Sequence, residues 1–165
     1  MTPIDDVIGD LDDAIENFTR ALGGTDAQRR TLRVALACIY ELRVHREGTG
    51  EERTAYHLRA EKTKNGLITE GLVFLRGKAT HFVTKVLDPA KQPLLPRGKT
   101  LPGKHTFVGS NVVWRPCADL GPLTGTSPKE TKRLQLYRDY AAGQPVLAGL
   151  HASREFLVND PGPVV

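Results

Sequence analysis

Cysteine is scarce in this chain, which has only Cys38 and Cys117 among its 165 residues. Two cysteines cannot form the disulfide framework of a small secreted domain. Cys38 lies in the apolar run 34–39 and is expected to be a small buried residue. No Cys or His spacing resembles a zinc site, and no Gly-x-Ser-x-Gly nucleophile motif occurs. We therefore expect a cytoplasmic domain that folds without disulfides, a metal ion or another cofactor.

Long apolar runs are also missing. No window of about twenty apolar residues exists, so no membrane span and no membrane partner are expected. The first residues are acidic and lack the apolar core of a signal peptide. A hydrophobic fraction of 39% and a charged fraction of 25% are typical of soluble globular proteins. The length predicts a single domain over residues 1–165, large enough to bury its own core.

Charge is unevenly distributed along the chain, although its net value is only +4. The first nineteen residues carry six acidic groups and no base, and basic residues dominate from residue 29 to residue 78. Two interpretations remain open: solvated helix faces, or a basic cleft that follows a phosphate backbone. In the second case the candidate substrate-binding residues are Lys78, Arg43 and His45.

Apolar residues recur at helical spacing through most of the chain. Thr25 with Gln28, and Ser127 with Glu130, are helix-capping pairs that mark where two of the helices begin. The expected helices cover about residues 3–22, 26–47, 51–64, 66–87, 128–142 and 145–158. This pattern predicts an all-α fold.

Residues 88–126 are different in character, because they contain six prolines and several glycines. Such a segment cannot be a helix, so we expect an irregular, proline-rich insertion. Its centre favours a short β-hairpin formed by residues 106–108 and 112–114. Trp114 is expected to pack this insertion onto the helices, and the functional alternative is stacking on a nucleobase.

One apolar segment, residues 71–81, presents two groups suited to catalysis, Arg76 and, five residues later, His81. A guanidinium binds phosphate through bidentate hydrogen bonds and keeps its charge, whereas an imidazole exchanges a proton near neutral pH. Together they can support attack of a ribose 2′-hydroxyl on the adjacent phosphodiester without a metal ion. Arg76 and His81 are therefore the candidate catalytic residues.

Residues 71–81, in which an arginine is followed by four residues and then a histidine, resemble the signature segment of the HEPN superfamily. Residues 112–116, 137 and 143–146 resemble the C-terminal half of actinobacterial HEPN-like proteins of unknown role. The resemblance covers about residues 30–158. It implies an HEPN-like helical bundle that dimerises, with a cleft between the two protomers. It also implies metal-independent ribonuclease activity, often that of a toxin.

The first hypothesis is therefore a metal-independent endoribonuclease of the toxin or defence type. The resemblance implies that Arg76 binds the scissile phosphate and that His81 acts as general acid or base. On the predicted helix the two side chains lie about 140° apart, so a facing helix of a homodimer would complete the cleft. The alternative is a non-catalytic dimeric module that binds RNA, a nucleotide or a protein partner such as an antitoxin. Gly77, which has no side chain to orient a neighbour, favours that alternative.

Overall fold

The computed structural model describes residues 3–21, 25–76, 83–86, 112–117, 120 and 127–162. Within these residues, six helices and two short strands follow one another in the order α1 (Ile4–Arg20), α2 (Asp26–Glu47), α3 (Gly50–Glu61), α4 (Lys64–Arg76), β1 (Thr84–Val86), β2 (Val112–Trp114), α5 (Pro128–Tyr140) and α6 (Val146–Asn159). The described part of the chain is predominantly helical, which confirms the prediction of an all-α fold.

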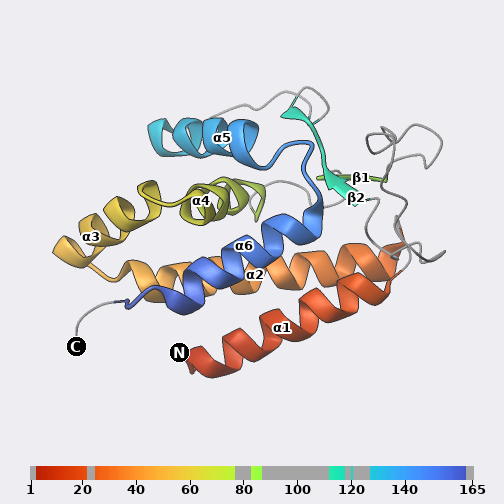
Figure 1. Ribbon diagram of the computed structural model, residues 1–165, viewed down its shortest axis with the longest axis horizontal. Helices are drawn as coiled ribbons and strands as arrows, with labels where there is room; N and C mark the ends of the chain where they lie inside the picture. The colour runs from red at the N-terminus through yellow and green to blue at the C-terminus, as the bar shows by residue number, and fades with distance from the viewer. Residues whose placement is uncertain are drawn as a thin grey trace, which may run out of the picture.

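The helices pack in successive layers (Figure 1). The α1 helix packs on α2, and α6 contacts α1, α2 and α4. The α4 helix also contacts α2, α3 and α5, so helices surround it on several sides. The outermost layers in the view of Figure 1 are α1 at the bottom and α5 at the top. Among the described residues, none of the helices combines the length and the apolar character needed to cross a membrane.

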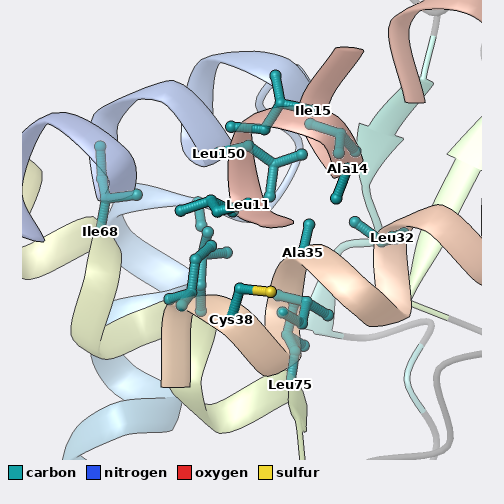
Figure 2. Close-up of a cluster of buried hydrophobic side chains, with 14 of the residues drawn as sticks. Leu11, Ala14, Ile15, Leu32, Ala35, Cys38, Ile68, Leu75 and Leu150 are labelled. Atoms are coloured by element: carbon teal, nitrogen blue, oxygen red, sulfur yellow. The ribbon is translucent and has the colours of Figure 1, made fainter. Parts of the chain in front are cut away.

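The core forms where the apolar faces of these helices converge. The α1 helix buries Val7, Leu11, Ile15 and Phe18, which confirms the stripe expected from its spacing. Figure 2 shows side chains of α1, α2, α4 and α6 meeting in one cluster, with Cys38 among them. The predicted burial of Cys38 is therefore confirmed.

Both capping pairs predicted from the sequence are present. The Thr25 hydroxyl accepts a hydrogen bond from the Gln28 amide at 3.3 Å and begins α2. At the start of α5, the Ser127 hydroxyl accepts from the Glu130 amide and the Glu130 carboxylate accepts from the Ser127 amide. These reciprocal bonds satisfy amide groups that lack a partner within the helix, and so fix where α5 begins.

The α4 helix is the central helix of the fold rather than an amphipathic surface helix. Its residues 68–75 are all buried. A Cβ atom at Gly71 would lie 2.8 Å from the backbone nitrogen of Tyr137, and one at Gly66 would lie 2.4 Å from the carbonyl oxygen of Ala60. The two glycines therefore let the backbones of α5 and of the α3 C-terminus approach α4 closely.

The helix predicted over residues 66–87 is wrong at residues 84–86. The α4 helix ends at Arg76, and Thr84–Val86 form a strand that pairs antiparallel with Val112–Trp114, with Thr84 opposite Trp114. The β-branched side chains at positions 83, 84 and 86 suit an extended chain, a preference that the apolar spacing concealed. Of the predicted hairpin, residues 106–108 lie outside the described residues, and residues 112–114 pair with β1.

Trp114 joins β2 to the helical bundle. Its side chain is fully buried, and its backbone exchanges hydrogen bonds with Gln144 and Gly143 after α5. The Tyr137 hydroxyl donates to the carbonyl of Arg115 at 2.5 Å, which ties β2 to α5 a second time. The prediction that Trp114 packs this segment onto the helices is confirmed. Its full burial excludes the alternative of stacking on a nucleobase.

Candidate functional site

Arg76 is the last residue of α4, where that helix emerges from the bundle and its side chain becomes exposed. The guanidinium carbon lies 3.7 Å from the ring centroid of Tyr40 on α2. Stacking on an aromatic ring holds the guanidinium plane while leaving its edge N–H groups available for hydrogen bonds. Within the described residues, Arg76 makes no ion pair or hydrogen bond, so those donors are available to a ligand.

Arg76 helps to line a pocket of about 390 Å³. The described lining residues come from α2, α4 and α5 and are Tyr40, Val73, Phe74, Arg76, Glu130 and Arg133. The Glu130 carboxylate accepts a hydrogen bond from the Ser127 amide at 3.1 Å, so it serves the α5 cap rather than Arg76. Two guanidinium groups and one carboxylate thus border this pocket in the described part of the chain, and Arg133 is paired with Glu70 at 3.3 Å. Arg76 is therefore the guanidinium of this pocket that can turn to an anionic group.

The other two predicted residues of the motif segment, Lys78 and His81, lie outside the described residues. The structure therefore places Arg76 but gives no distance from it to His81. The expected separation of about 140° assumed a helix that continues past Arg76. Residues 77–82 lie outside the described residues, so that separation stays a prediction.

The proposed role of Arg43 in substrate binding is wrong. The side chain of Arg43 is 2% exposed, and its guanidinium is held by two carboxylates. Its Nη1 lies 2.5 Å from Glu47, and its Nε lies 2.6 Å from Glu70. These bonds occupy the donors that a phosphate would need, because a guanidinium has a fixed fork of N–H groups. Arg43 therefore joins α2 to α4.

His45 lies on α2, is partly exposed and is not among the residues that line the Arg76 pocket. The structure therefore does not bring His45 to Arg76. Arg133 on α5, which the sequence did not single out, takes a place beside Arg76. No local pattern marks Arg133, because it reaches the pocket only through the packing of α5 on α4.

A buried ionic network extends from Arg43 and was missed by the sequence analysis. Glu70 on α4 also accepts hydrogen bonds from the Tyr56 hydroxyl at 3.2 Å and from Arg133 at 3.3 Å. Glu47 Oε1 lies 3.1 Å from His57 Nε2. The signal in the sequence was Glu70, a single acidic residue within the apolar stretch of α4. A carboxylate that is buried there needs a cationic or hydrogen-bonding partner. The partner's identity depends on tertiary packing.

Electrostatics in this network favour a charged Glu47 and a neutral Tyr56. Burial by itself raises the pKa of Glu47, but hydrogen bonds from Arg43 and the charges of Arg43, Lys129 and His57 outweigh burial and lower it. Burial and the nearby Glu70 raise the pKa of the Tyr56 hydroxyl, so it stays protonated and donates to that carboxylate. The network is therefore a set of satisfied charges, not a pair prepared for proton transfer.

We expect the protein to lose stability in acid because of this network. The pKa of Glu47 is lower in the folded protein than its unfolded value, so its contribution is present above the unfolded pKa and is lost as the pH falls through the folded pKa. Urea unfolding between about pH 5.5 and pH 3 should show a falling free energy of unfolding. In Glu47→Gln that fall should be smaller. An equal fall in both proteins would contradict the assignment.

Among the described residues, no group of three or more His, Cys, Asp or Glu side chains is arranged to hold a metal ion. Comparisons of the chain with protein-family models, with curated proteins and with solved structures found no match. The resemblance of residues 71–81 to the HEPN signature therefore remains a prediction from the sequence.

Proposed function

We propose that this protein is a metal-independent endoribonuclease in which Arg76 binds the scissile phosphate and His81 transfers the proton. The observation that carries the proposal is the exposed guanidinium of Arg76, which is stacked on Tyr40 and has no carboxylate partner among the described residues. An arginine held in this way can bind phosphate with two parallel hydrogen bonds. Arg76 differs in this respect from Arg43, whose donors two carboxylates occupy.

The reaction assigned to this site is attack of a ribose 2′-hydroxyl on the adjacent phosphorus. Arg76 would neutralise the charge that grows on the phosphoryl oxygens in the transition state. His81 would take the proton of the 2′-hydroxyl or give one to the leaving 5′-oxygen. The products would be a 2′,3′-cyclic phosphate and a free 5′-hydroxyl. We further propose that a second protomer completes the cleft, as the HEPN resemblance implies.

The test is cleavage of labelled single-stranded RNA and tRNA in the presence of EDTA. Arg76→Ala and His81→Ala are each expected to lower the cleavage rate by at least about 100-fold, because each removes a group that acts in the transition state. The cleavage rate of Arg76→Lys should lie between those of the wild type and Arg76→Ala, since lysine keeps the charge but loses the bidentate geometry. Arg138→Ala, which removes an exposed arginine of α5 outside the pocket, is the matched control.

A substrate with a single 2′-deoxy nucleotide at the cleavage site tests the nucleophile directly. It should remain intact while neighbouring sites are cut. Cleavage that survives both Arg76→Ala and His81→Ala would contradict the proposal.

The second candidate is a non-catalytic module that binds RNA, a nucleotide or a protein partner such as an antitoxin. It is favoured by the described lining of the Arg76 pocket, in which α2, α4 and α5 bring Arg76, Arg133 and the ring of Tyr40 together. In that case the wild type would bind labelled RNA without cutting it, and Arg76→Ala would weaken binding. Measuring binding and cleavage on the same RNA therefore separates the two functions.

A further inference from the structure

A second cavity, of about 460 Å³, lies between α3, α4 and α5. Arg133 lines both this cavity and the Arg76 pocket. Its apolar wall is formed by Ala60, Leu67, Pro128 and Leu136, and its polar groups include His57, Lys129, Lys132 and Arg133. The volume is within the range of about 300 to 1,000 Å³ that is usual for small-molecule sites. The cavity thus combines an apolar wall with a cationic edge.

The described lining of this cavity carries more cations than carboxylates. Its cations are Lys129, Lys132 and Arg133, and its carboxylates are Glu61 and Glu70. Three positive charges against two negative charges leave an excess of one. A phosphate group, which is anionic and accepts several charge-assisted hydrogen bonds, suits this edge.

Two of these cations can turn toward a ligand at little cost, and the third keeps one donor available without turning. The Lys129 side chain is 55% exposed, and its Nζ lies 3.9 Å from Glu47, a separation at which an ion pair contributes little. Lys132 is 64% exposed and pairs with the exposed carboxylate of Glu61. Arg133 uses Nε and Nη2 on Glu70, both at 3.3 Å, and its Nη1 donates to no acceptor among the described residues. Free donors therefore line one edge of the cavity.

We propose that this cavity binds a small phosphate monoester whose organic part is compact and apolar. The phosphate lies against Lys129, Lys132 and Arg133, where it takes up the excess positive charge. The organic part lies against Leu67 and Leu136, both of which are partly exposed in the empty cavity. Burial of apolar ligand surface and pairing of charge then act together. This site is separate from the RNA cleavage proposed above and does not depend on it.

Calorimetric titration with phenyl phosphate, inorganic phosphate and phenol tests the two halves of the site. Phenyl phosphate is expected to bind at least about tenfold more tightly than inorganic phosphate, and phenol should not bind measurably. The double variant Lys129→Gln/Lys132→Gln should bind phenyl phosphate at least about tenfold more weakly. Both lysines are exposed, so circular dichroism should show an unchanged fold.

Two further variants make the test specific. Arg138→Gln removes a charge from the same helix outside the cavity and should leave binding unchanged. Leu136→Gln should abolish the preference for phenyl phosphate over inorganic phosphate. Equal affinity for those two ligands, no binding of either, or equal losses in Arg138→Gln and the lysine double variant would overturn the proposal.

The Arg76→Ala variant distinguishes this site from the Arg76 pocket, because Arg76 does not line the larger cavity. Phenyl phosphate should bind to that variant as it does to the wild type. Loss of binding would place the ligand in the Arg76 pocket and overturn the second site, without contradicting RNA cleavage.

Discussion

Replacing Arg43 with methionine is expected to destabilise the protein by about 3 to 5 kcal/mol, the usual effect of removing one partner from a buried ion pair. Methionine fills much of the same space but leaves Glu47 and Glu70 without their shared cation. Taking two carboxylates out of water is unfavourable unless an opposite charge and hydrogen bonds compensate. Urea unfolding at neutral pH, monitored by circular dichroism, measures the loss.

The free energy of unfolding of Arg43→Met should fall less in acid than that of the wild type. Without Arg43, the main cause that lowers the pKa of Glu47 is lost, and protonation of Glu47 removes an uncompensated buried charge. The difference in stability between wild type and variant should therefore shrink as the pH falls. Arg29→Met, which breaks an exposed pair with Asp26, is the control and should cost less than about 1 kcal/mol. Similar losses in both variants would contradict a structural role for Arg43.

Replacing Gly71 with alanine is expected to destabilise the protein by about 2 to 3 kcal/mol through overpacking. The added Cβ would lie 2.8 and 2.9 Å from the backbone nitrogen and Cα of Tyr137, so α4 and α5 must move apart. Tyr137 is fully buried and packs near Phe74, so this movement also loosens the core. Thermal or urea unfolding of the purified variant measures the effect.

Gly9→Ala is the matched control for Gly71→Ala. Gly9 lies on the exposed face of α1, away from the helix ends, and an added Cβ there meets no atom within 4 Å. Alanine is the better helix former by about 1 kcal/mol, so this substitution should stabilise the protein. The same chemical change should thus have opposite signs at the two positions. Stabilisation by Gly71→Ala would show that α5 does not pack on α4 as described.

The local features of the helices could be read from the sequence. The apolar spacing of α1 and the caps at Thr25 and Ser127 predicted where helices lie and where two of them begin. These signals are local, because a cap bonds to an amide three residues away and an amphipathic stripe repeats within two turns. The strand at residues 84–86 was not predicted, because these residues become a strand only by pairing with residues 112–114.

The candidate site was predictable only in part. The sequence pointed to Arg76 and His81 because a permanent cation is followed by a side chain that exchanges a proton near neutral pH. The structure places the guanidinium of Arg76 on the ring of Tyr40, in a pocket that Arg133 also lines. Net charge and helical position made Arg43 look equally available. Its burial followed from Glu70, which lies 27 residues further along the chain. A sequence lists charges but does not say which of them neutralise one another.

The sequence by itself determined the helical class, the caps and the apolar faces of this protein, because those properties depend on residues within a few turns of one another. Tertiary structure decided which arginine is buried and which is exposed, and which glycines lie against another backbone. It also decided that Lys129, Lys132 and Arg133 border one cavity between α3, α4 and α5. The physical reason is that burial, charge pairing and close backbone approach are relations between segments far apart in the chain.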